Sequence, residues 1–406
     1  MAVDPDLPLF ESPGRRFIAF RPLIRAVGLA GDPRKLVLAL AGLVALVVGW
    51  SLIDRAFGIV KSVAGDLDPG ATIGFFELPF DRRWGKAARL VLEPGLVVVR
   101  PFARLFARNV GVGLWGWALA KGLWALTVWG LVGGAIARVT AVQVAAGQGV
   151  GVATAARFAL RRWLALIGAP LTPFLAVGVV AAGTAAFGLL YRLPGGIGAT
   201  VAGFLGFVPL LAGVLLALIL LGLALGWPLM VATVAAEGED VADALSRSYS
   251  YVNQRTIRYL ANLLTAGLLG VLGLVAVLFF ARVVLDLGGW GVGLGAPAGW
   301  DPRTGGATLP GSKVQFRDFW VGAVSWVAHA YLYSYFWSTI TVIYLVLRQD
   351  VDGTDPHDVF LLEQAADTFA GPMPASPAAG PGAGPGLDQA GPGSMGDSPS
   401  SIVKGA

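Results

Sequence analysis

Residues 197–236 read IGATVAGFLGFVPLLAGVLLALILLGLALGWPLMVATVAA and contain no charged side chain. A helix crosses the hydrocarbon core of a bilayer with about 20 mostly apolar residues. The run is therefore too long for one span, while two full spans would leave no residues for a turn. Pro209 and Pro228 interrupt it, which favours one broken span with an interfacial or re-entrant extension. We expect a single crossing here, near residues 205–227.

The composition of the whole chain agrees with residence in a membrane. Of the 406 residues, 56% are hydrophobic and 14% are charged, and the mean hydropathy is +0.70. Soluble domains carry about 25% charged residues, and a chain this apolar cannot hide its side chains in one water-facing core. Five further apolar stretches predict spans near residues 36–53, 110–137, 163–190, 260–281 and 319–347. The predicted fold class is an all-α, polytopic transmembrane helix bundle of about six spans, with interfacial amphipathic helices.

The segments around these spans differ in composition. A basic segment, residues 1–35, precedes the bundle at 36–348, and a solvated acidic flank is expected at 349–370. The tail, residues 371–406, is rich in Gly, Pro and Ala and is expected to be disordered, because it cannot bury enough apolar surface. Between the fourth and fifth spans, residues at helical spacing predict an amphipathic helix docked on the membrane or the bundle. These residues are Val241, Ala244, Leu245, Ser248 and Val252.

Basic residues in the loops indicate the orientation of the chain. Counted over all loops, they are nearly balanced between the two sides of the membrane. In the short loops around the third span, Arg138, Arg157, Arg161 and Arg162 lie on one side, and Arg192 lies alone on the other. Cytoplasmic loops carry an excess of Lys and Arg. We therefore expect a multi-pass protein of the cell membrane with both termini in the cytoplasm.

Several functional classes find no support in the sequence. There is no cysteine, which excludes disulfides, thiol nucleophiles and zinc–thiolate sites. No Walker A, GxSxG or HExxH pattern occurs. We therefore expect no enzymatic activity, catalytic residue, cofactor, metal or nucleic-acid partner. The net charge of +5, spread over membrane-flanking loops, instead indicates contact with the anionic headgroups of the lipid bilayer.

Polar residues inside the spans are candidate functional groups, because they are costly in lipid. His329 lies within the sixth span, and Tyr333 follows it by one helical turn. Four more polar side chains of this span recur at helical spacing, namely Tyr331, Ser334, Ser338 and Thr341. With Lys121 of the second span they would line a polar pathway, and His329 would respond to protons. Alternatively, the hydroxyls join packed helices and Lys121 extends to the membrane interface.

A second candidate site consists of basic residues that precede the second span. Pro101 could open a short helix with Arg100, Arg104 and Arg108 on one side. Such a helix would lie along the membrane surface, with its arginines in contact with lipid phosphates. An ordinary basic flank of a span is the alternative.

Two parts of the chain carry a family resemblance. The first reads GWPLM at 226–230 and EGEDVADALSRSYSYV at 237–252; the second reads YFWS at 335–338 and IYLVLRQDVDG at 343–353. Over residues 70–365 the chain resembles an uncharacterised family of bacterial polytopic integral membrane proteins. It is also distantly similar to the membrane domain attached to some glycerophosphodiester phosphodiesterases. No phosphodiesterase domain is present, so the resemblance implies a bacterial inner-membrane location and a helical architecture without an enzymatic activity.

These observations support two hypotheses of function. The leading one is a non-enzymatic integral membrane protein with a structural, assembly or envelope role, with a homo-oligomer or another membrane protein as its partner. The alternative is a transporter or channel that uses a polar pathway lined by the sixth span.

Overall fold

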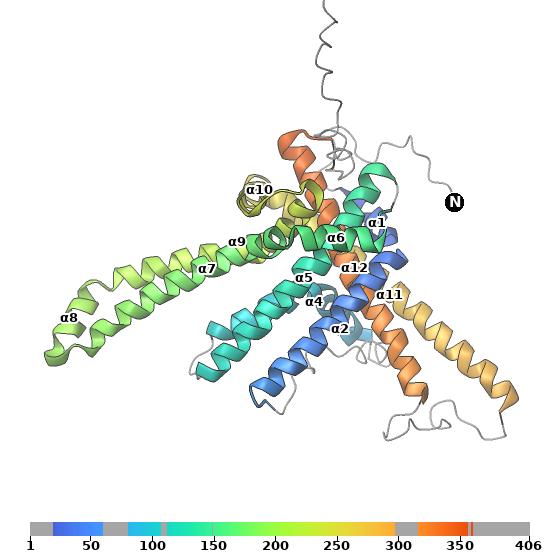
Figure 1. Ribbon diagram of the computed structural model, residues 1–406, viewed down its shortest axis with the longest axis horizontal. Helices are drawn as coiled ribbons and strands as arrows, with labels where there is room; N and C mark the ends of the chain where they lie inside the picture. Colours follow the sequence, from blue (N-terminus) through green and yellow to red (C-terminus); the bar gives the residue numbers. More distant parts are fainter. Residues whose placement is uncertain are drawn as a thin grey trace, which may run out of the picture. The chain divides into compact units, whose positions relative to one another are not determined.

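The computed structural model describes residues 19–59, 80–106, 112–147, 149–296, 316–355 and 359. These residues form eleven α-helices and no strand, which confirms the predicted all-α class. Six of the helices are long and apolar enough to cross a membrane, so the chain is a multi-pass membrane protein. They are α2 (Pro33–Ala56), α5 (Val112–Ala146), α7 (Trp163–Gly188), α9 (Phe207–Glu237), α11 (Thr256–Gly295) and α12 (Phe316–Asp352) (Figure 1).

The uncharged run contributes to one candidate membrane span, Phe207–Glu237. It forms the short helix α8 (Ile197–Phe204) and then α9. Pro228 does not break α9, which continues through it to Glu237. Gly238 follows with a φ of 68°, a left-handed conformation that ends helices and that glycine adopts at little cost.

Six crossings place the first residue of α2 and the last residue of α12 on the same side of the membrane, which we call the N-terminal side. Three amphipathic helices belong to this side by their place in the chain. They are α1 (Phe20–Leu29) before α2, α6 (Val152–Arg161) between α5 and α7, and α10 (Val241–Gln254) between α9 and α11. The helix α10 confirms the amphipathic helix predicted there, and it buries Ala244 and Ser248. On the opposite side, α4 (Phe80–Ala103) follows α2, and α8 follows α7.

Part of the basic N-terminal segment is a packed helix. The helix α1 contacts α11 and α12, and it buries Leu23 and Ala26. Asp32 then caps α2 by accepting a 2.9 Å hydrogen bond from the backbone N–H of Arg34, and Pro33 fills the first helical position. Both residues favour a helix start at this point. Residues 1–18 and the tail, 371–406, lie outside the described residues.

The helix α4 is amphipathic, yet it packs into the bundle. It contacts α5, α11 and α12, and it buries Leu90 and Val97. Phe102, near its end, stacks on Phe174 of α7 with ring centroids 4.0 Å apart. The expectation of a short helix that opens at Pro101 is wrong, because Pro101 lies in the last turn of this longer helix.

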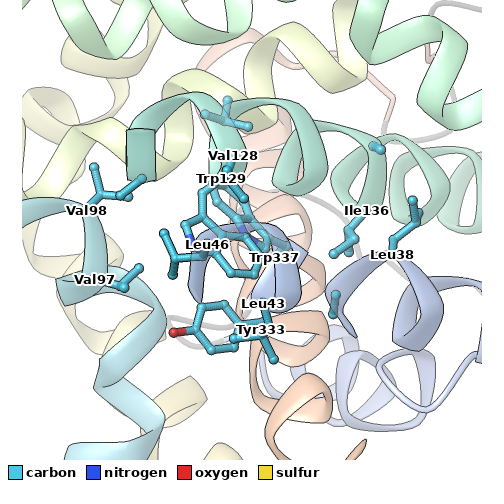
Figure 2. Packing of buried hydrophobic residues seen from close by; sticks show 14 of the residues in the cluster. Leu38, Leu43, Leu46, Val97, Val98, Val128, Trp129, Ile136, Tyr333 and Trp337 are labelled. Atoms are coloured by element: carbon cyan, nitrogen blue, oxygen red, sulfur yellow. The ribbon is translucent and has the colours of Figure 1, made fainter. Parts of the chain in front are cut away.

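Aromatic side chains fill the core where α5 and α12 meet (Figure 2). Trp129 of α5 stacks on Tyr333 of α12 at 4.2 Å between ring centroids. Trp337 packs edge-on against Trp227 of α9 at 5.7 Å. A Cβ atom added at Gly133 of α5 would lie 2.2 Å from the indole of Trp337. Glycine at this position therefore permits the close approach of the two helices.

The spans differ in how much of each is covered by the rest of the chain. The most apolar stretches of α5 and α12 are 83% and 94% buried, whereas those of α9 and α11 are 6% and 17% buried. The helices α7 and α9 pack along each other (Figure 1), and large residues such as Leu210 and Leu218 of α9 remain exposed. Apolar surface of this extent is stable where hydrocarbon surrounds it.

Candidate functional site

Lys121 forms an ion pair inside the protein. Its Nζ lies 2.7 Å from Oδ1 of Asp54 at the end of α2, and both residues are buried. The ammonium also lies 5.2 Å from the ring centroid of Trp50 and 4.7 Å from that of Trp117. Trp117 Nε1 donates a 2.7 Å hydrogen bond to Asp54 Oδ1. The pair joins α2 to α5 in an aromatic environment, and the Lys121 ammonium is buried within the protein.

His329 of α12 is paired with a different acid. Its Nε2 lies 3.0 Å from Oε1 of Glu93 on α4, and the Tyr333 hydroxyl donates to the same oxygen at 3.4 Å. All three residues are buried. His329 Nδ1 is buried as well and has no hydrogen-bond partner within the described ranges. Imidazole side chains commonly carry protons in proteins, so this buried trio is the candidate for proton chemistry.

The hydroxyl groups of the predicted stripe join α12 to its neighbours. Tyr331 donates to the backbone oxygen of Val27 at 3.4 Å, and Ser334 donates to that of Ala30 at 2.7 Å. Thr341 donates at 2.7 Å to a carbonyl one turn earlier in α12 itself. These contacts are those of the helix-packing alternative, in which hydroxyls bond across an interface.

Ser338, the remaining member of the stripe, meets a buried lysine. Lys35 Nζ and Thr140 Oγ1 each lie 3.2 Å from Ser338 Oγ, and Thr140 Oγ1 also lies 3.0 Å from the carbonyl oxygen of Ile136. Lys35 and Thr140 both donate toward Ser338 Oγ, and the single hydrogen of the Thr140 hydroxyl is shared between Ser338 and the Ile136 carbonyl. Since all three side chains are fully buried, this chain of bonds is a structural link between α2, α5 and α12.

Carboxylates and arginines connect the ends of the helices on the N-terminal side. Glu237, the last residue of α9, lies 2.6 Å from Arg247 Nη1 of α10 and 3.1 Å from Arg348 Nε of α12. The Tyr344 hydroxyl donates to the same carboxylate. Residues 237–252 and 343–353 therefore contact one another in this cluster.

Glu239, a second carboxylate beside Arg247, has a raised pKa. Glu239 Oε1 lies 2.6 Å from Arg247 Nη2. Burial, and then the neighbouring Glu237 carboxylate, raise the pKa of Glu239 to about 7, although Arg247 acts in the opposite direction. Glu239 therefore changes charge near neutral pH.

The start of the acidic flank is packed, in contrast to the expected solvated segment. Asp350 pairs with Arg258 and, at 3.1 Å, with Arg255 Nε, and its side chain is buried. Tyr251 of α10 donates to Asp352. These contacts tie the end of α12 to the connection between α10 and α11.

The three arginines predicted to contact lipid headgroups do not share one environment. Arg100 is exposed on α4. The Arg104 guanidinium carbon lies 5.3 Å from the ring centroid of Trp117, at a distance typical of a cation–π contact. Arg108 lies outside the described residues, and the headgroup contact stays a prediction.

Sequence reasoning missed Asp54, Glu93 and Lys35. Glu93 shares a helical face with Leu90 and Val97, because these residues are three and four positions away. A carboxylate on the apolar face of an amphipathic helix requires a buried partner. This pattern in the sequence could have indicated that Glu93 is paired inside the protein. For Asp54 and Lys35, which stand near the ends of an apolar span, the sequence offers no indication of a partner.

The fold and these sites define a class: a multi-pass membrane protein with a core of aromatic rings and buried ion pairs. Comparison with protein-family models, with curated proteins and with solved structures finds no match to this chain.

Proposed function

We propose that this chain is a non-enzymatic protein of the bacterial inner membrane, with both termini in the cytoplasm, that acts as a structural or assembly component of the cell envelope. The observation that carries this proposal is the exposure of α9. Its most apolar stretch is the most apolar among the six spans and is only 6% buried. The bacterial location also rests on the resemblance of residues 70–365, and it remains a prediction.

The core supports an assembly role because its polar groups are used internally. Asp54 pairs with Lys121, and Glu93 pairs with His329, which holds α2 to α5 and α4 to α12. The helices α7 and α9 extend this fixed core with an apolar surface. Helices associate in membranes through van der Waals packing, so this surface suits a second copy of the chain or another membrane protein.

Site-specific crosslinking in cells tests the assembly role. A photoreactive residue at Leu210 or Leu218, both exposed on α9, is expected to give a discrete protein adduct of defined mass. The same residue at Leu332, buried in α12, is the matched control and should give none. Adducts with lipid alone at every exposed α9 position would overturn the proposal.

In a strain that lacks the gene, we expect altered envelope integrity with an unchanged metabolite profile.

A second candidate function is proton-coupled transport, and the trio of Glu93, His329 and Tyr333 favours it. Ionisable groups inside a membrane protein commonly mark ion or proton pathways.

The test of transport is proton movement across the membrane of vesicles that contain the purified full chain and a trapped pH dye. Transport predicts that Glu93→Gln and His329→Gln abolish the movement. The double variant Asp54→Asn/Lys121→Met, which removes the other pair, should retain it; no proton movement by the wild type would exclude this function.

A further inference from the structure

The bend between α6 and α7 differs from the other basic regions of the N-terminal side. The helix α6 ends at Arg161, and Trp163 begins α7, so the direction of the chain changes at Arg162. On the inner face of α6, Phe158 is buried and lies 4.6 Å from the guanidinium carbon of Arg138. This contact, together with the buried Ala155 and Ala159, fixes which face of α6 points outward.

The outward face combines positive charge with apolar side chains. Arg157 and Arg161, one helical turn apart, are exposed, and Arg162 is half-buried. Leu160 lies between the two exposed arginines, and Trp163 and Leu164 follow them at the start of α7; all three are exposed large apolar residues. The bend lies where the candidate span α7 begins, and at such a position apolar side chains favour acyl chains and arginines favour headgroups.

The bend lies in a long stretch of sequence without acidic residues. No Asp or Glu occurs between Glu93 and Glu237 in the sequence. Among the described residues, Arg157, Arg161 and Arg162 form no ion pair. Four other arginines of the same side are each paired with a carboxylate, namely Arg247, Arg255, Arg258 and Arg348.

We infer that the α6–α7 bend is a binding surface for anionic phospholipid. The guanidinium groups donate hydrogen bonds to headgroup phosphates, for which their planar geometry is suited. Leu160, Trp163 and Leu164 contact the adjoining acyl chains, and this apolar contact favours a membrane lipid over free phosphate. The surface is separate from the exposed stretch of α9 on which the proposed assembly role rests.

The test compares the purified full chain in vesicles of phosphatidylcholine with vesicles that also contain phosphatidylglycerol. The measurement is the apparent affinity for phosphatidylglycerol, from lipid retained by the protein and from the shift in thermal unfolding. Each basic residue near an anionic surface contributes roughly a factor of five. We therefore expect the variant Arg157→Gln/Arg161→Gln/Arg162→Gln to bind phosphatidylglycerol at least about tenfold more weakly, with a loss that shrinks at high salt.

Two further variants keep the test decisive. Arg55→Gln/Arg89→Gln/Arg192→Gln removes the same charge from exposed arginines on the opposite side, and it should retain the affinity. Arg157→Lys/Arg161→Lys/Arg162→Lys keeps the charge and should retain most of the binding, even if the glutamine variant does not fold. An equal loss in the opposite-side variant would overturn the inference, as would a wild type that does not prefer phosphatidylglycerol.

Discussion

The helices α12 and α9 are both long enough to cross a membrane, but their most apolar stretches have opposite surroundings. The most apolar stretch of α12 is the least apolar among the six spans and is 94% buried, while that of α9 is the most apolar and is 6% buried. In water this order would be reversed, because apolar residues would be the buried ones. In a bilayer the lipid accepts the apolar helix, and the protein interior must supply hydrogen-bond partners for the polar one. The polarity of a span thus indicates whether it packs inside.

The largest predicted effect concerns a buried ion pair of the core. The substitution Asp54→Asn removes the carboxylate beside Lys121 and should destabilise the protein by about 3–5 kcal/mol, because a buried charge loses its partner. The measurement is unfolding of the full chain in detergent. The matched control, Asp286→Asn, breaks an exposed pair with Arg282 on α11 and should cost less than about 0.5 kcal/mol. Similar losses in both variants would mean that α11 is covered as the core is.

Glycine-to-alanine substitutions compare the packed core with the exposed stretch of α9, because each adds one methyl group. Gly133→Ala would place a Cβ atom 2.2 Å from the buried Trp337 indole, and we expect a loss of about 3 kcal/mol, at the upper end for overpacked cores. At Gly213 of α9 a Cβ atom meets nothing within 4 Å. Gly213→Ala should therefore be neutral or stabilise the helix by up to about 1 kcal/mol. Thermal unfolding in the same detergent measures both, and a destabilised Gly213→Ala would contradict the exposure of α9.

Leucine truncation should give a smaller difference. Leu332→Ala leaves a cavity in α12, and we expect a cost of about 2 kcal/mol, at the low end for buried leucines because the unfolded reference state lies in apolar surroundings. Leu218→Ala on α9 should cost less than about 0.5 kcal/mol in the purified monomeric chain, because Leu218 is exposed there and detergent fills the space. Equal costs for the two variants would contradict the exposure of Leu218 within the monomer.

The smallest effect is a pH dependence at the end of α9, where the helix leaves the membrane. The pKa of Glu239 is raised to about 7, so the folded state binds a proton more tightly than the unfolded state. This contribution to stability is present at low pH and is lost as the pH rises from about 4.5 to about 7. The melting temperature of the wild type, relative to Glu239→Gln, should therefore fall over this range. A rise would mean that the Arg247 ion pair outweighs the burial of Glu239.

The sequence predicts the helices well, but it does not predict which side chains pair with one another. The six spans, the single crossing of residues 197–236 and the amphipathic α10 follow from local composition and period. The partners of His329 and Lys121 do not, because Glu93 lies 236 residues before His329 and on a helix with several other charges. Helical spacing also grouped Tyr331 with Ser338, but the spacing does not indicate whether such hydroxyls face water, lipid or another helix.

The sequence alone therefore determined that this chain is an all-α protein that crosses the membrane about six times. It could do so because about 20 apolar residues suffice for a span, and each span is a property of its own segment. The tertiary structure decided which spans lie inside, which acid pairs with Lys121 or His329, and which apolar faces remain exposed. These features depend on contacts between segments far apart in the chain, and the cost of a buried charge is known only once its neighbours are in place.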